Sequence, residues 1–221
     1  MQRDPQEIYG LAKTAKGYRA RQNILRATAK VVANQGLESA TVLAICEQAD
    51  IGRTTLYNYF KDAEDAVARV LEESATELQA QFEHIHGERE RGVKRLGYCL
   101  RFILERAYAD PDWGRLFVEL YKFGPQVDMY LRAQVELELQ AAGAEGDADL
   151  SKKETDALVR VISASLIRLC DRLAKKEADI SEIAPTITAL LRGAGVKKRT
   201  AASASNQKFP KDALVGASLF D

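Results

Sequence analysis

The chain has 221 residues, of which 46% are hydrophobic, and it carries equal numbers of basic and acidic side chains, 32 of each. The three cysteines, Cys46, Cys99 and Cys170, are odd in number and far apart, which fits neither a disulfide framework nor a zinc site. The chain also lacks an apolar run of about 18 residues for a membrane helix and the apolar core of a signal peptide, so we expect a cytoplasmic protein without membrane contact.

The net charge of zero hides an uneven distribution along the chain. Residues 1–61 carry nine Lys or Arg and five Asp or Glu, whereas residues 62–192 carry 18 basic and 25 acidic side chains. The remaining residues are again basic, with five against two. A basic first segment beside an acidic body favours contact between that segment and a polyanion, although solvated surface charge can produce the same split.

The first segment contains three short helical patterns. Gly36 stands where the first helix is expected to end, and the Thr41 hydroxyl is suited to cap the second. Leu56 and Phe60 lie four residues apart and give the third helix an apolar anchor. The predicted helices cover residues 21–35, 42–49 and 53–60.

From residue 63 onward the pattern is one of long helices with brief breaks. Asp62 is placed to cap the first of them, and Ser151 and Glu154 form the pattern of a capping box. Pro185 lacks the amide that a helix interior needs, so the last helix begins near it or bends there. The predicted helices cover residues 63–85, 89–109, 113–121, 125–142, 152–177 and 181–192.

These patterns predict an all-α protein of about nine helices with no strand. A helix-turn-helix domain with a basic N-terminal arm is expected over residues 1–62, and a helical body over residues 63–195. Residues 196–221 are small, polar and aperiodic up to a weakly apolar end, which favours a flexible tail or a loosely docked arm. The basic residues of the expected arm are either ordinary surface charge or contacts to the phosphates or the minor groove of DNA. They are Lys13, Lys16, Arg19 and Arg21.

Two short helices joined by a three-residue break form the helix-turn-helix arrangement, whose second helix enters the major groove of DNA. Arg53 is suited to guanine, Asn58 to adenine and the threonine methyls to thymine, while tyrosine hydroxyls and Lys61 suit phosphates. Because three rings on one short helix cannot all face inward, Phe60 is expected in the core and the tyrosines outside it. The predicted DNA-binding residues are Thr41, Arg53, Thr54, Thr55, Tyr57, Asn58, Tyr59 and Lys61.

The stretch from Arg21 to about Glu73 resembles the DNA-binding region of the tetracycline-repressor-like (TetR) family of bacterial transcriptional regulators. The resemblance rests above all on the block TLYNYF, residues 55–60, followed by Glu64. The segment DPDWGRLFVEL, residues 110–120, is similar to the family's sixth helix. This resemblance implies a homodimeric reader of a palindromic operator, most often a repressor that a small-molecule effector releases.

Three positions depart from the family pattern. Asp50 replaces the usual turn glycine, and we expect it to adopt the left-handed conformation that Asp tolerates. Ala63 and Leu43 stand where the family often has basic residues that hold phosphates, and Lys61 is a candidate replacement for the first. Cys46 occupies a usually small position and is interpreted as a buried spacer and not as a redox sensor.

The resemblance implies an effector pocket among the middle helices of the body, which are rich in aromatic residues. Polar residues among those aromatics are suited to orient a ligand, although core packing is the ordinary role of such rings. The predicted pocket residues are Tyr98, Arg101, Phe102, Trp113, Phe117, Tyr121 and Met129.

The resemblance also implies a homodimer built from the last two predicted helices of each chain, residues 152–177 and 181–192. Both carry an apolar stripe, and both have small residues that permit close approach, although such stripes also serve as core. Among the stripe residues are Leu158, Ile162, Leu166, Ile187 and Leu190.

An enzyme is the competing class, and the sequence gives it little support. Phosphate-binding, nucleophile-elbow and HExxH zinc motifs are all missing from the sequence, and the only histidines are His84 and His86. We therefore expect neither an enzyme nor a metal or other cofactor. Two further alternatives are a DNA-binding protein controlled by a protein partner and a helical carrier with an idle motif.

Overall fold

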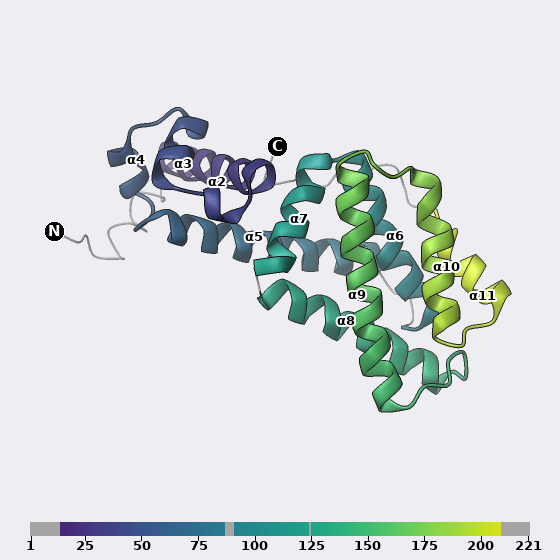
Figure 1. Ribbon diagram of the computed structural model, residues 1–221. Helices are drawn as coiled ribbons and strands as arrows, with labels where there is room; N and C mark the ends of the chain where they lie inside the picture. The colour runs from purple at the N-terminus through teal and green to yellow at the C-terminus, as the bar shows by residue number, and fades with distance from the viewer. Residues whose placement is uncertain (1–13, 87–90, 124, 209–221) are drawn as a thin grey trace. The chain divides into compact units, whose positions relative to one another are not determined.

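The computed structural model describes residues 14–86, 91–123 and 125–208. Over these residues the chain forms ten α-helices and two short 3-10 helices, with no strand (Figure 1). The all-α expectation is therefore confirmed, and the helix beyond the nine predicted is α11 (Lys198–Ser205). Within the described residues no helix is long and apolar enough to cross a membrane.

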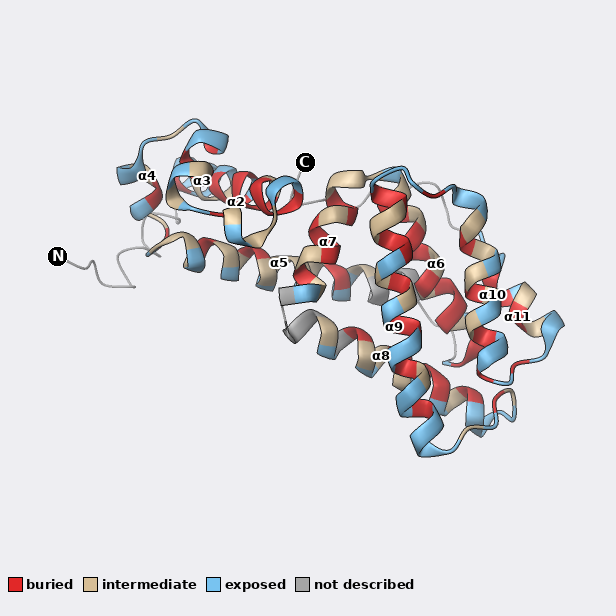
Figure 2. Ribbon diagram, viewed as in Figure 1, coloured by how far each residue is buried: buried red, intermediate tan, exposed pale blue. Residues whose placement is uncertain are grey.

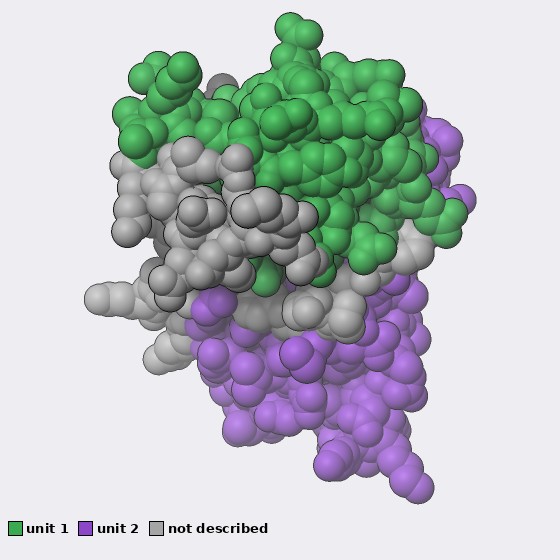
Figure 3. Space-filling view, turned by 90° about the vertical axis from the view of Figure 1, so that its left-hand side faces the viewer, with its two compact units in different colours: residues 1–77, 217–221 green, residues 78–216 purple. Residues whose placement is uncertain are grey.

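The chain divides into two compact units between Glu77 and Leu78 (Figure 3). This division lies inside helix α5 (Ala63–His86), whereas the sequence pattern placed the boundary before that helix. The difference arises because the first half of α5 supplies buried residues, Ala66 and Val70, to the core of the first unit.

The first unit contains the first half of α5 and three helices. They are α2 (Ala15–Gln35), α3 (Val42–Ala49) and α4 (Arg53–Tyr57), with the 3-10 turn η1 (Leu37–Ser39) between the first two. Its core is apolar and fully buried, as the red faces of α2 and α3 show in Figure 2. The residues that fill this core include Ile24, Leu25, Val32, Ile45, Leu56 and Phe60.

Helix α2 begins earlier than the sequence pattern indicated. Thr14 caps it by accepting a hydrogen bond from the Gly17 amide at 3.0 Å. Lys16 and Arg19 therefore lie on the first turns of a helix and not in an arm that precedes it, while residues 1–13 lie outside the described residues.

The second unit is organised around α6 (Val93–Ala109), which contacts every later helix of the unit. Ten of its side chains or glycines are buried, and this accounts for its mostly red ribbon in Figure 2. The surrounding helices are α7 (Pro111–Phe123), α8 (Pro125–Ala144), α9 (Lys152–Ala174), α10 (Ile183–Gly193) and α11, with the 3-10 turn η2 (Ile180–Glu182) before α10.

Local signals set several helix ends as predicted. Ser151 and Glu154 form the capping box at the start of α9. The Asp62 carboxylate accepts the amide of Asp65 at 2.8 Å, as expected of a residue that caps α5. Pro185 lies in the first turn of α10, where its missing amide costs no hydrogen bond.

The expectation of a flexible tail from residue 196 is wrong for its first part. Lys198–Ser205 form α11, which packs on α6 and α10 and buries Ala201, Ala204 and Ser205. Small residues let this helix approach closely, because the Ala204 carbonyl oxygen lies where a side chain on Gly97 would begin. This helix has no recognisable apolar period, because the residues that α11 buries are small.

Candidate DNA-binding surface and ligand cavity

The turn between α3 and α4 depends on one residue with a left-handed backbone. Asp50 has φ 53° and ψ 52°, as the sequence predicted, and its amide donates to carbonyls at the end of α3. The Asn23 side chain of α2 donates to the Ala49 carbonyl oxygen at 2.9 Å and satisfies another group at that helix end. The orientation of α3 is therefore fixed by its turn and by α2.

Helix α4 is held by its apolar side and presents its polar side to solvent. Leu56 is fully buried and Phe60, just after the helix, is 1% exposed, which confirms the core role predicted for Phe60. By contrast Tyr57 is 49% exposed, and Arg53 and Thr54 are exposed as well. A helix fixed on one side with polar, aromatic and basic groups on the other can enter a major groove.

The other predicted DNA-binding residues are less exposed or have structural roles. Thr55, Asn58 and Tyr59 are half-buried. Thr41 is exposed, and its hydroxyl accepts the Ala44 amide at 3.2 Å, so it is the N-cap of α3 as predicted. Lys61 is exposed, and its backbone amide donates to the Asp65 carboxylate at 2.9 Å. All eight residues lie in the first unit, and their contact with DNA stays a prediction.

An ion pair ties α2 to α5 beneath this surface. Arg21 and Glu73 approach to 2.9 Å, and the Arg21 guanidinium lies 5.8 Å from the centre of the Phe60 ring. Arg21 therefore serves packing within the unit and not an arm. Pattern reasoning missed both this role and that of Asn23, because each depends on residues far along the chain.

The cysteines do not form a chemical site. Cys46 is buried in α3 beside the turn, and burial raises the pKa of its thiol more than the nearby charge of Arg53 lowers it. Cys99 and Cys170 are free as well, and burial raises the pKa of both thiols. Within the described residues no group of His, Cys, Asp and Glu side chains is arranged to hold a metal ion.

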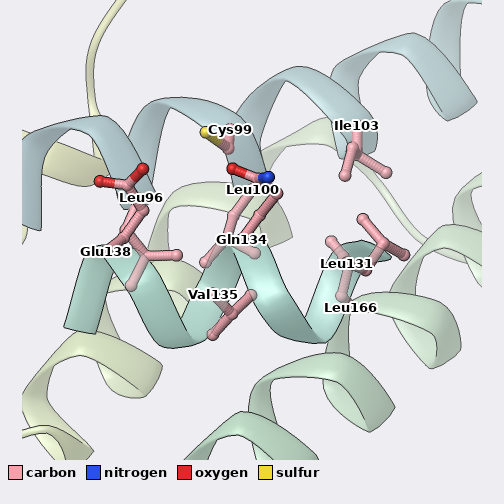
Figure 4. Close-up of a pocket in the computed structure, with 9 residues that line it drawn as sticks. All are labelled: Leu96, Cys99, Leu100, Ile103, Leu131, Gln134, Val135, Glu138 and Leu166. Atoms are coloured by element: carbon pink, nitrogen blue, oxygen red, sulfur yellow. The ribbon is translucent and has the colours of Figure 1, made fainter. Parts of the chain in front are cut away.

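The second unit contains a cavity between α6, α8 and α9 with about 340 Å³ of empty space, counting the part at its open side. Figure 4 shows that α6 and α8 supply most of its wall. Six of the lining residues are aliphatic, and three are polar or sulfur-containing. The lining residues are Leu96, Cys99, Leu100, Ile103, Leu131, Gln134, Val135, Glu138 and Leu166.

The seven residues predicted to line an effector pocket do not line this cavity. Tyr98 and Phe102 are buried on the other side of α6. Trp113 and Phe117 are buried and stacked, with ring centres 5.1 Å apart. Core packing, the alternative that the sequence left open, accounts for these four rings.

The remaining three predicted pocket residues are polar or exposed. Arg101 of α6 donates to the Ser205 carbonyl oxygen at 2.7 Å and so holds α11. Tyr121 of α7 is half-buried, and a hydrogen bond to the Asp128 carboxylate adds to the effect of burial in raising the pKa of its phenol. Met129 is 67% exposed. A shared pocket for these residues stays a prediction.

The first unit defines the class of protein, which is a DNA-binding protein of the helix-turn-helix type. Residues 24–70 match the sequence model of the family described as bacterial regulatory proteins, tetR family. Residues 24–70 therefore form a DNA-binding domain of the TetR type.

Solved structures of other regulators and receptors have a fold similar to that of this chain over most of its length. RolR in complex with resorcinol is 21% identical with a TM-score of 0.63, over 88% of this chain and 96% of that one. A gamma-butyrolactone receptor described as ArpA-like is 20% identical with a TM-score of 0.68, over 87% and 95%. The fatty acid degradation regulator FadR from Bacillus halodurans is 18% identical with a TM-score of 0.65, over 80% and 97%. Among curated protein sequences none matches the chain.

Proposed function

We propose that the protein is a ligand-responsive repressor that binds a palindromic operator as a homodimer in the bacterial cytoplasm. The observation that carries this proposal is the two-sided character of α4, where Leu56 is buried while Arg53, Thr54 and Tyr57 face solvent. In this arrangement Arg53 reads guanine, and Tyr57 and Lys61 hold phosphates that fix the register.

Specific binding needs two copies, because one short helix reads too few bases. The apolar stripe predicted for dimerisation is mostly consumed within the protomer, since Ile162, Leu166 and Ile187 are fully or nearly fully buried. The interface we propose is therefore the outer side of α9 and α10, where Val161 is 52% exposed. This side also carries the exposed small residues Ala157, Ala164 and Ala189. A further helix, α11, follows this pair along the chain.

Release of DNA follows if an effector in the second unit displaces helix α5, which continues without a break into the DNA-binding unit. A dimer fits its operator only when the two reading helices match half-sites about one helical turn apart, roughly 34 to 36 Å. The solved structure of RolR with resorcinol supports a small-molecule effector for this fold.

The test is a selection of random duplex DNA on the purified protein, followed by binding measurements on the winning site. We expect a palindrome, and we expect Tyr57→Ala and Asn58→Ala to weaken binding to it by about 1 to 3 kcal/mol. Asn206→Ala, an exposed asparagine after α11, is the control and should bind as the parent does. Failure to enrich any sequence, or normal binding by both the Tyr57 and the Asn58 variant, would refute the assignment.

Lys61 provides a second arm of the test because a phosphate contact carries no sequence information. Lys61→Ala should weaken binding to all duplexes and reduce the salt dependence by about one unit of slope. Lys152→Ala, an exposed lysine at the start of α9, is the matched control. Equal salt slopes for the two variants would show that Lys61 does not contact the phosphates of DNA.

A further inference from the structure

The wall of the cavity between α6, α8 and α9 is mostly aliphatic. Leu96, Leu100 and Ile103 of α6 face Leu131 and Val135 of α8 across it (Figure 4). Binding of an apolar ligand to an apolar wall is favourable, whereas binding of a charged ligand is unfavourable because the charge loses its water. The cavity therefore selects an occupant that is mostly apolar.

One end of the cavity carries a buried carboxyl group, Glu138, whose pKa is raised by burial, while Arg95 and Arg91 counteract that rise. Glu138 is 2% exposed, and its carboxylate accepts the Gly92 amide at 2.8 Å and lies 3.1 Å from Arg91 and 3.2 Å from Arg95. The two arginines are not among the residues that line the cavity, so the carboxylate is the charged group at its wall. The Arg91 and Arg95 guanidiniums are thus already paired with a group of this chain.

The field of Glu138 reaches into the cavity. Burial is the main cause that raises the pKa of the Cys99 thiol, and the charge of Glu138 raises that pKa more than Arg95 lowers it. Cys99 therefore stays a neutral thiol and not a nucleophile. A carboxylate ligand at the same place would lose hydration and meet the charge of Glu138.

Gln134 supplies the polar group that can be matched by a ligand. It lies one turn before Glu138 on α8, lines the cavity and is half-buried. Within the described part of the chain its side-chain amide makes no hydrogen bond with another residue. An amide offers both a donor and an acceptor, so it can pair with a hydroxyl.

We propose that this cavity is the effector site and that it takes a small, uncharged, largely apolar molecule with a hydroxyl group, which pairs with Gln134, while Glu138 excludes carboxylates. The role of the cavity as an effector site rests on the proposed function, whereas its preference for this kind of ligand rests on the residues that line it. The ligand site proposed here lies on a different face of α6 from the aromatic residues that the sequence predicted as pocket lining.

The small size of the cavity indicates that ligand binding would change the positions of the surrounding helices. Only about 20 Å³ of it is open to the centre of a water molecule, which is room for roughly one water. A ligand with one ring must therefore push α6 and α8 apart. Because α6 contacts every later helix of its unit, such a movement spreads through the body.

Three single-ring probes separate the chemical terms: phenol, benzene and benzoate. Calorimetry on the full-length protein should give binding of phenol, binding of benzene that is roughly 2- to 10-fold weaker, and binding of benzoate at least about 100-fold weaker than phenol. Equal binding of benzoate and phenol, or no binding of phenol and benzene at millimolar concentration, would overturn the proposal.

Variants assign the terms to residues. Gln134→Leu should lower phenol affinity to that of benzene and leave benzene unchanged, whereas Gln140→Leu on the same helix, outside this cavity, should change neither. Glu138→Gln should reduce the difference in affinity between phenol and benzoate by at least about tenfold, because it removes the negative charge at the cavity wall. If Glu138→Gln does not fold, the proposal is still tested by the three probes on the parent protein and by the variants Gln134→Leu and Gln140→Leu. A Gln134→Leu variant that binds phenol as the parent does would refute the hydroxyl contact.

Operator binding in the presence of phenol separates this inference from the proposed function. If the probes bind as expected but the selected operator stays bound, the cavity is a ligand site and its role as effector site is wrong. If the operator is bound but no probe enters the cavity, the DNA-binding function stands and the inference fails. If the parent protein binds no operator even in the absence of a probe, the proposed function alone is refuted.

Discussion

Gly97 of α6 offers a direct test of whether α11 is docked. Alanine in a helix interior is favoured over glycine by about 1 kcal/mol, so Gly97→Ala would stabilise an uncovered helix. In the structure, however, a Cβ at Gly97 would lie 2.7 Å from the Ala204 carbonyl oxygen and 2.9 Å from its carbonyl carbon. Because these are backbone atoms of α11, the helix has to move away.

The contacts at risk set the size of the effect. The Arg101 guanidinium donates to the Ser205 carbonyl oxygen at 2.7 Å, and the Thr188 and Ser205 hydroxyls are 2.6 Å apart. The Gln207 side chain donates to the Lys94 carbonyl oxygen at 2.7 Å. Three hydrogen bonds of about 0.5 to 1.5 kcal/mol each amount to roughly 1.5 to 4.5 kcal/mol. After the gain in helix propensity, we expect Gly97→Ala to lower the free energy of unfolding by about 0.5 to 3.5 kcal/mol.

Urea denaturation of two chain lengths measures this effect against its control. In the full-length protein Gly97→Ala should be destabilising, whereas in a chain that ends at Val196 the same substitution should be stabilising by about 1 kcal/mol. The sign of the effect therefore depends on the presence of α11. A stabilising effect in both chains would show that α11 does not lie against Gly97 and would refute the reasoning.

Three further outcomes are expected. Asp50→Val should lower the free energy of unfolding by about 1 to 2 kcal/mol relative to Asp50→Gly, because only glycine adopts a φ of 53° without strain, and equal denaturation midpoints would contradict the turn geometry. Hydrogen bonds from Ser151 hold the pKa of the Glu154 carboxyl below its usual range, so their stabilisation is complete above the ordinary pKa and is lost as pH falls through the lowered one. The difference in thermal stability between the parent and Ser151→Ala should therefore shrink on acidification, and a constant difference would argue against this linkage. Burial raises the pKa of the Cys99 and Cys170 thiols, so both should react slowly with a disulfide reagent at about pH 8 and rapidly in denaturant, with fast native labelling as the contrary result.

The turn between α3 and α4 was predictable because its determinants are local. The Thr41 hydroxyl caps α3 three residues ahead, and Asp50 tolerates the left-handed conformation by its own chemistry. Leu56 and Phe60 lie one helical turn apart, so the period itself shows which side of the segment is buried. Of the predicted DNA-binding residues, Thr54 is turned outward by this period and is exposed. Arg53 is exposed as well, although the period places it on the side of Leu56.

The cavity was not predictable in the same way. The sequence favoured aromatic residues as pocket lining, but Trp113 and Phe117 fill the core by stacking on each other. The lining is instead aliphatic and includes Glu138, whose three partners lie about 43 to 47 residues earlier in the chain. Which of several apolar faces closes and which stays open depends on how the helices meet, and a helical period carries no information on that.

The sequence by itself determined the helical class, most helix ends and the reading face of α4, because capping, turn chemistry and apolar period act over fewer than about ten residues. Only the tertiary structure decided that α11 forms, since its small residues gain stability from the close approach to α6 and not from a period of their own. It also decided that Arg21 and Asn23 brace the DNA-binding unit and that Glu138 lies at a cavity wall. Each of these depends on contacts between residues that are distant in the chain, and such contacts exist only after the helices have packed.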